Sequence, residues 1–219
     1  MSDIVIFGAG DIAKLAHFYF STDSDHNVVG FTVDSQYRSS DEYLGLPLVD
    51  FETVAERFPS SKYKMFVALS YAKMNKARSK VCGSAKELGY DLVSYVSSRC
   101  SYLSQFPCGE NCFILEDNTI QPFVKIGNNV TLWSGNHIGH DSVIGDNCFI
   151  TSHVVVSGHV NVEPYCFIGV NATLRNSITI GESTLIGAGS VIMKSTKPKE
   201  VYIPERAKRL DKSSDEIEL

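Results

Sequence analysis

Residues 138–150 read Ile-Gly-His-Asp-Ser-Val-Ile-Gly-Asp-Asn-Cys-Phe-Ile, with an aliphatic residue at every sixth position. The same period runs through the stretch from about Cys108 to Ile192. Gly directly follows the aliphatic residue in six of these repeats, and a small or β-branched residue stands four positions after it in most of them. The aliphatic positions are Ile114, Ile120, Ile126, Leu132, Ile138, Ile144, Ile150, Val156, Val162, Ile168, Leu174, Ile180, Ile186 and Ile192.

This period fits neither the 3.6-residue repeat of a helix nor the two-residue repeat of a flat strand. It is typical of a β-helix, in which short strands alternate with tight corners and three strands close one triangular coil. We therefore predict an all-β region of eighteen-residue coils, with the aliphatic side chains stacked inside. The glycines should accept backbone angles that a β-carbon would resist.

Composition restricts the function classes. The chain has 219 residues, 43% hydrophobic and 21% charged, with a formal net charge of −5. No basic run supplies the footprint of a nucleic-acid binder, and no apolar stretch is long enough for a membrane span. Without a signal-peptide pattern, the cytoplasm is the expected location. Cys112, Cys148 and Cys166 fall on the small-residue position, so we predict packing and neither disulfides nor metal ligation.

The segment before the coils has a different pattern, that of a small parallel sheet with a Rossmann-like βαβαβ order. A strand at 4–7 leads into Gly8-Ala9-Gly10-Asp11-Ile12-Ala13 and a helix to about residue 20, and a second strand at 27–33 ends in Asp34. Such a turn brings backbone N–H groups to a phosphate, and Asp34 can accept hydrogen bonds from a ribose or a base. The segment therefore predicts a nucleotide site.

Further elements are expected at 44–49 (strand or loop), 50–57 (short helix) and 65–69 (strand). Residues 70–76 and then a helix to about residue 88 should follow, and 91–96 should close the small sheet. Residues after the 65–69 strand lie where doubly wound sheets place ligands. Those residues are Lys73, Asn75, Lys76 and Arg78. A solvated helix start would explain them equally well.

His140 is the candidate catalytic residue of the repeats. A neutral imidazole is a natural general base, and the adjacent Asp141 could hold its tautomer if the chain bends at that corner. His137 and His153 are open between a cleft and a packing role, and His159 is treated as structural or solvated.

Together the repeats, the Gly-Ala-Gly-Asp opening and the run from Gly135 to Gly145 resemble the left-handed β-helix sugar acyltransferases of the sialic acid O-acetyltransferase type. That family includes N-acetyltransferases acting on nucleotide-linked amino sugars for bacterial surface glycans. The resemblance implies a homotrimer with active sites between prisms, acetyl-CoA along the coils and a nucleotide sugar on the N-terminal domain.

The resemblance also implies residue roles. His140 matches the catalytic base and Asp141 its carboxylate; Gly158 matches a backbone N–H near the thioester carbonyl. Val170 and Ala188 match contacts to the pantetheine arm of CoA. The nucleotide contacts correspond to Gly8, Gly10 and Asp34, and further substrate contacts are expected at Asn136 and Trp133.

Three positions depart from the family pattern. Phe149 replaces a histidine common near the thioester, so Asn136 or His153 could contact the acyl group instead. Trp133 would reshape the sugar pocket, and residues 202–208 replace the family's closing motif, which puts the CoA-phosphate contacts in doubt.

We predict a nucleotide-sugar-binding domain at 1–97, an acetyltransferase domain at 98–194 and a tail at 195–219. The expected activity is direct acetyl transfer from acetyl-CoA to a nucleotide-linked amino sugar, with no metal. A sugar O-acetyltransferase is the alternative. Other classes are a γ-type carbonic anhydrase-like metalloprotein, built on His137, His140 and His153, and a non-catalytic trimeric scaffold.

Overall fold

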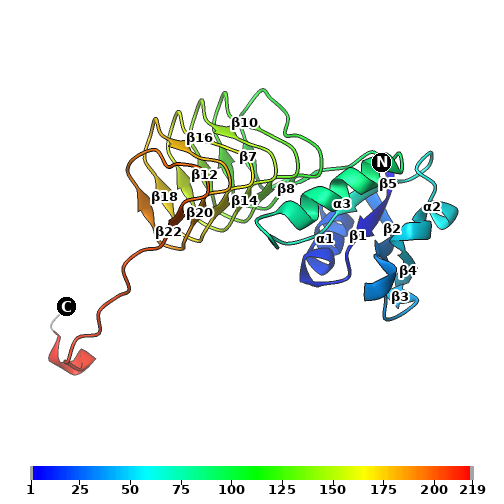
Figure 1. The fold of residues 1–219 in the computed structure, drawn as a ribbon, viewed down its shortest axis with the longest axis horizontal. Coiled ribbons are helices and arrows are strands. Elements are labelled where there is room, and N and C mark those ends of the chain that lie inside the picture. The colour runs from blue at the N-terminus through cyan, green and yellow to red at the C-terminus, as the bar shows by residue number, and fades with distance from the viewer. Residues whose placement is uncertain (1, 218–219) are drawn as a thin grey trace.

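A computed structural model describes residues 2–217 and consists of a small α/β domain followed by a stack of triangular coils (Figure 1). The sheet of the α/β domain has the order β3-β4-β2-β1-β5, parallel except for the antiparallel pair β3–β4. Its strands are β1 Ser2–Phe7, β2 His26–Val33, β3 Glu42–Tyr43, β4 Leu46–Asp50 and β5 Lys64–Val67. Its helices are α1 Asp11–Thr22, α2 Val54–Arg57 and α3 Lys76–Glu87.

The helices of this domain cover both faces of the sheet, because strands buried on both sides need two apolar layers. Ala13, Ala16 and Phe20 of α1 pack on one face. Cys82 and Ala85 of α3 pack on the other. No helix within residues 2–217 has the length and hydropathy to span a membrane.

The coils form three parallel sheets, here called the first, second and third faces. The first face contains β6 Tyr95–Val96, β8 Phe113–Ile114, β11 Thr131–Leu132, β14 Phe149–Ile150, β17 Phe167–Ile168, β20 Leu185–Ile186 and β22 Val201–Tyr202. The second contains β7 Ser101–Tyr102, β9 Thr119–Ile120, β12 His137–Ile138, β15 Val155–Val156, β18 Thr173–Leu174 and β21 Val191–Ile192. The third contains β10 Lys125–Ile126, β13 Val143–Ile144, β16 Asn161–Val162 and β19 Thr179–Ile180.

Neighbouring strands pair with a register of one coil, as Ile138 with Ile120 and Val156 shows, which confirms the predicted eighteen-residue repeat. The predicted aliphatic positions, from Ile114 to Ile192, form one buried core with the small residues that follow them. Stacked aliphatic side chains inside every coil are therefore what closes the prism.

The backbone of the corners corrects the role predicted for the glycines. Left-handed angles occur three positions after the aliphatic residue, for example at Asn129 (φ 55°) and Asp141 (φ 57°). Gly139 has no such angle, but a β-carbon on it would lie 2.6 Å from the backbone nitrogen of Gly158 in the next coil. Glycine is needed there because successive coils approach closely.

Two strand pairings lie at the ends of the coils. Tyr95–Val96 (β6) pairs with β8 in the first face and does not close the N-terminal sheet as predicted; only Leu92 bridges to Met65 there. Val201–Tyr202 (β22) pairs with β20, so coil pairing continues beyond residue 194. The division into two domains and a tail stays a prediction, and its residues 218–219 lie outside the described part.

The α/β domain docks on the first face and its two flanking corners. The Asn111 side chain accepts from Val67 N at 2.7 Å and donates to Val67 O at 3.2 Å, as a further strand would. Arg78 of α3 reaches the same corner as Asn111, and Tyr19 of α1 donates to Glu116 at 2.8 Å. These contacts leave the second and third faces free of the α/β domain.

Asp23, at the end of α1, joins the domains through one carboxylate oxygen that accepts from Ser98 N, Tyr95 Oη and Ser97 Oγ. The hydrogen bonds from Ser98, then Tyr95, lower the pKa of Asp23 to about 2. A lowered carboxyl pKa stabilises the fold above the unfolded-state pKa, and that stability is lost as pH falls through the folded-state pKa.

Asp23→Asn is therefore expected to cost about 1 kcal/mol at neutral pH, since partial exposure weakens these bonds. The difference from the parent should shrink as pH falls from about 4 towards 2. Urea unfolding at a series of pH values measures it. Asp25→Asn is the control, and a penalty independent of pH would contradict the assignment.

Candidate active site

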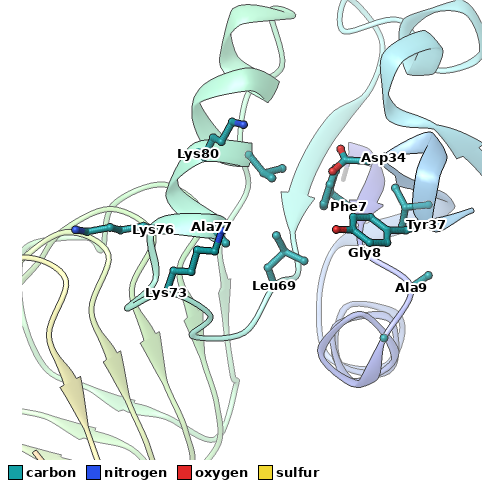
Figure 2. A pocket seen from close by; sticks show the side chains of 13 residues that line it. Phe7, Gly8, Ala9, Asp34, Tyr37, Leu69, Lys73, Lys76, Ala77 and Lys80 are labelled. Atoms are coloured by element: carbon teal, nitrogen blue, oxygen red, sulfur yellow. The ribbon is translucent and has the colours of Figure 1, made fainter. Parts of the chain in front are cut away.

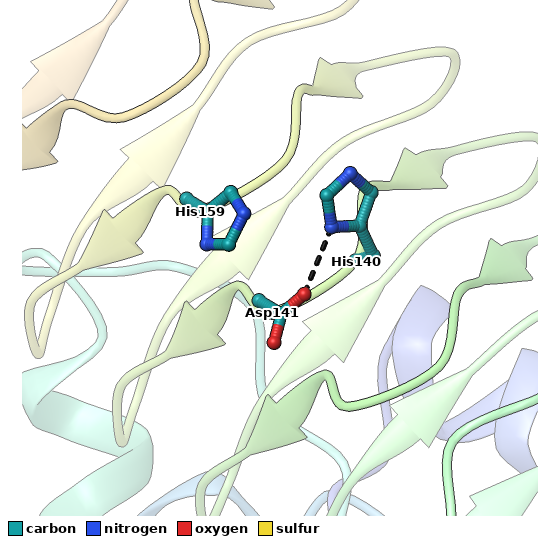
Figure 3. A group of neighbouring side chains, drawn as sticks. All are labelled: His140, Asp141 and His159. Carbon is teal, nitrogen blue, oxygen red and sulfur yellow. Dashed lines mark hydrogen bonds and ion pairs between the residues drawn. The ribbon is translucent and has the colours of Figure 1, made fainter.

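The His140–Asp141 pair lies at the corner between the second and third faces, directly after β12 (Figure 3). His140 Nδ1 and Asp141 Oδ2 are 2.9 Å apart, and the side chains are 53% and 42% exposed. Asp141 has a φ of 57°, so the chain bends there and the two neighbours can meet. The bend that this hydrogen bond needed is confirmed. A carboxylate that accepts from Nδ1–H leaves the Nε2 lone pair free to take a proton.

Gly158 lies one coil beyond His140 at the same corner. A β-carbon built on it would stand 2.8 Å from His140 Nε2, so the glycine gives the imidazole its room. Its carbonyl accepts from Ser177 N, while its N–H has no hydrogen-bond partner within residues 2–217. An unpartnered N–H beside a base is suited to an oxyanion.

The sequence analysis treated His159 as structural or solvated, but in the structure it lies beside His140. Its ring centroid is 5.0 Å from that of His140 at an interplanar angle of 87°. Ligand atoms of His140, Asp141 and His159 lie within 4.8 Å of one another (Figure 3). His153 instead stands against Gly135 at the corner between the first and second faces. The His137–His140–His153 ligand set considered for an anhydrase does not converge in this protomer.

Val170 and Ala188 occupy the corner between the first and second faces, one coil apart. Both are exposed, but they are at a different corner from Gly158. Their predicted contacts with CoA therefore stay a prediction, and within one protomer they do not share a groove edge with the base.

The structure buries Asn136, so its predicted substrate contact stays a prediction. This residue is 1% exposed. Its amide nitrogen donates to Trp133 O, and its amide oxygen accepts from Val154 N at 2.8 Å. Both polar groups hold neighbouring backbone. Trp133 is half-buried against the α/β core, and its ring centroid lies 6.4 Å from that of Phe149. It is therefore not beside His140 in the same protomer.

A cavity of about 590 Å³ opens at the carboxyl ends of β1 and β2 (Figure 2). The predicted residues Gly8, Gly10 and Asp34 all line it. Gly8 has a φ of 128°, and a β-carbon there would stand 2.8 Å from Ala68 O, so only glycine fits this turn. The structure therefore brings the predicted nucleotide residues together.

The opposite wall of this cavity comes from α3 and the turn before it. Lys73, Lys76 and Lys80 line it, across from Asp34 and Tyr37 (Figure 2). The sequence analysis missed Lys80, one helical turn after Lys76, and Tyr37, three residues after Asp34. Asn75 and Arg78, which it considered, are buried in the domain contact instead. The ammonium groups of Lys73 and Lys80 beside a glycine turn form an anion-binding wall, whereas that of Lys76 points away from the cavity toward the coils (Figure 2).

Residues 123–158 match the model of the bacterial transferase hexapeptide (six repeats) family. The chain as a whole shares its fold, an α/β domain followed by stacked triangular coils, with several solved structures. The structure of PerB from Caulobacter crescentus, in complex with CoA and GDP-perosamine, superposes with a TM-score of 0.79 at 23% identity, covering 92% of this chain and 93% of that one.

Two further structures share the fold. The acetyltransferase domain of PglB from Neisseria gonorrhoeae has a TM-score of 0.77 at 17% identity over 92% of this chain and 96% of that one. WeeI from Acinetobacter baumannii has a TM-score of 0.77 at 20% identity with the same coverage. The predicted fold class, an α/β domain followed by a left-handed β-helix, is confirmed.

The curated relatives match about half of this chain. An acyl-[acyl-carrier-protein]–UDP-N-acetylglucosamine O-acyltransferase from Nautilia profundicola is 31% identical over 107 residues, 46% of this chain and 41% of the relative. The Campylobacter concisus enzyme of that name is 23% identical over 132 residues, 55% of this chain and 50% of the relative. The matches thus span half or less of these relatives' length.

Proposed function

We propose that this protein is an acetyl-CoA-dependent N-acetyltransferase that acts on a nucleotide-linked amino sugar. The observation that carries the proposal is the His140–Asp141 pair beside the unpartnered N–H of Gly158. The glycine- and lysine-lined cavity supports a nucleotide as the part of the acceptor that the α/β domain binds. The fold shared with structures that hold CoA and GDP-perosamine or acetyl coenzyme A supports the donor.

The chemistry assigned to these residues is direct transfer. The sugar amine attacks the thioester carbonyl, and His140 Nε2 accepts the proton that the nitrogen loses. Gly158 N–H donates to the oxyanion of the tetrahedral intermediate. The C–S bond then breaks and CoA leaves as the thiol, with the imidazolium as the source of its proton. Asp141 stabilises the imidazolium through Nδ1.

No protein side chain needs to be acylated in this scheme. Cys148 and Cys112 are fully buried in the coil core. Burial raises the pKa of the Cys148 thiol, and a hydrogen bond with Cys108, followed by burial, raises that of Cys112. A neutral buried thiol is a poor nucleophile.

We further propose a homotrimer in which each active site combines two protomers. The α/β domain docks on the first face, whereas His140 lies at the corner opposite that face. A nucleotide in the cavity of one protomer would therefore meet the base of its neighbour. Mixing His140→Ala with a Lys73→Asn/Lys80→Ala variant should restore activity after subunit exchange, and sedimentation should give three chains per particle.

A sugar O-acetyltransferase is the second candidate, favoured by the curated relatives, whose names specify O-acyl transfer. The discriminating experiment offers acetyl-CoA together with a panel of uridine, thymidine and guanosine diphosphate sugars, each as an amine and as its hydroxyl counterpart. Thiol release with amines alone supports N-transfer, and release with hydroxyls alone overturns it. A cytoplasmic role in bacterial surface-glycan (lipopolysaccharide O-antigen) synthesis belongs to the same proposal.

The lysine wall yields a separate prediction. Lys73→Asn/Lys80→Ala should weaken binding of a nucleoside diphosphate about tenfold at low ionic strength, because two cations leave the cavity. Asn is chosen at position 73 because it tolerates the left-handed angle there. The difference in affinity between variant and parent should shrink at high salt, because screening already weakens nucleotide binding by the parent protein. Calorimetry with UDP, GDP and dTDP measures it, with the exposed Lys62→Ala as control; equal affinity would contradict a phosphate site.

A further inference from the structure

A second histidine joins the His140–Asp141 pair at its corner of the coils. His159 occupies the same left-handed corner position as Asp141, one coil further on, with φ values of 58° and 57°. Ligand atoms of His140, Asp141 and His159 lie within 4.8 Å of one another. No other such group of His, Cys, Asp or Glu side chains occurs within residues 2–217. The cluster offers two imidazoles and a carboxylate, and the proposed transfer uses only one of the imidazoles.

The spacing of these atoms suits a single metal ion. Ligand atoms bonded to a tetrahedral Zn²⁺ at about 2.1 Å stand about 3.4 Å apart. The distance between His140 Nδ1 and Asp141 Oδ2, 2.9 Å, is shorter than this spacing, and the 4.8 Å that encloses the whole cluster is longer. All three residues are exposed, so side-chain rotations can bring the atoms to the bonding spacing without breaking core contacts.

The backbone fixes the two histidines relative to each other. His159 N donates to His140 O at 2.9 Å, so the imidazoles come from directly adjacent coils. Figure 3 shows that the ring nitrogen of His140 that meets Asp141 is on the side facing His159. Two nitrogen donors with one carboxylate favour a first-row transition metal, whereas Mg²⁺ and Ca²⁺ prefer oxygen ligands throughout.

We propose that His140 Nδ1, Asp141 and His159 bind a divalent first-row transition metal ion such as Zn²⁺, and that the ion inhibits the enzyme. Three protein ligands leave a fourth coordination position to water. The site goes beyond the proposed transfer, because the ion is not a cofactor of that reaction.

Inhibition follows from the tautomer that the ion imposes on His140. Without metal, the single proton of the neutral ring is on Nδ1, where Asp141 accepts it, and Nε2 is the base. When Nδ1 gives its lone pair to the ion, that proton moves to Nε2. Nε2 then has no lone pair for the proton of the attacking amine, so transfer stops while the nucleotide cavity stays free.

Calorimetry with Zn²⁺ in a weakly coordinating buffer tests the site without turnover. His159→Asn should bind the ion at least tenfold more weakly than the parent, since even loss of a group that only supports a ligand costs about 10–100-fold. Asn accepts the left-handed angle, so the corner should persist. His153→Asn is the matched control, because it removes another left-handed histidine (φ 57°) from a different corner. It should bind Zn²⁺ as the parent does; equal affinity of all three proteins would overturn the site.

Turnover gives the second readout. Zn²⁺ should inhibit the parent and His153→Asn alike, EDTA should reverse the inhibition, and His159→Asn should need at least tenfold more Zn²⁺. Because the released CoA thiol itself binds zinc, the acetylated product is measured by chromatography. Zinc binding that requires His159 in a protein that acetylates no acceptor would overturn the proposed function and keep the metal site. Acetylation with equal zinc sensitivity in the parent and His159→Asn, or activation by Zn²⁺, would overturn the inhibitory site.

Discussion

His140→Ala is expected to lower turnover by about a hundredfold or more, because the variant has no group that can take the proton from the attacking amine. The fold should survive. The ring is 53% exposed, and the corner is held by backbone groups, including His140 N donating to Gln121 Oε1 at 2.9 Å. Released thiol measures turnover, and calorimetry with CoA shows that donor binding is retained.

Two neighbours provide graded controls for this variant. Asp141→Asn keeps a residue that tolerates the left-handed angle but removes the charge that stabilises the imidazolium, so a loss of about tenfold or more is expected. His159→Ala removes a ring that contacts His140 without replacing the base, so its effect should be smaller. Parental activity in His140→Ala would eliminate it as the base.

The coil architecture was predictable because one constraint repeats in every turn of the prism. Each inward position, from Ile114 to Ile192, must be aliphatic, so the period is visible without any knowledge of distant contacts. The left-handed angles were wrongly predicted at Gly139 and its equivalents, whereas the structure has them at Asn and Asp residues two positions later. Conformational freedom and close backbone approach both select glycine, and sequence alone does not separate them.

The candidate site also contains residues that the sequence could predict and residues that it could not. His140 and Asp141 are adjacent in sequence, so their pairing needs only a bend. His159 is one coil after Asp141, so counting eighteen residues forward would have predicted that it lies beside the pair. Arg78 could not be placed, because its burial depends on how the α/β domain docks.

That docking leads to the second large expected effect. Arg78 is 2% exposed and has no carboxylate partner within residues 2–217. Its Nε donates to Asn129 Oδ1 at 2.8 Å and its Nη2 to Asn129 O at 2.9 Å. The guanidinium lies 5.5 Å from the Phe149 ring centroid. Burial lowers the Arg78 pKa to about 10, so the carbonyl groups offset the desolvation only in part.

Arg78→Ala should destabilise the protein by about 2–4 kcal/mol, because a cavity forms and buried acceptors lose their donor. Arg78→Lys should recover little, since an ammonium group does not reproduce the planar fork. Lys86→Ala is the matched control. Lys86 lies on the same helix, and its Nζ forms an ion pair with Glu110 at 2.8 Å, but both side chains are exposed. The expected loss of stability is therefore about 0.5 kcal/mol.

Trp133 is the sole tryptophan and is half-buried against the α/β core, so its fluorescence reports on the contact between the domains. In urea, Arg78→Ala should shift Trp133 emission at lower denaturant than the circular-dichroism transition of the coils, because the docked surface separates first. Because Lys80 and Arg78 both lie on α3, nucleotide binding should weaken over the same range of urea concentration as the shift in Trp133 emission. If Arg78→Ala and Lys86→Ala unfold alike, the buried guanidinium does not hold the domains together.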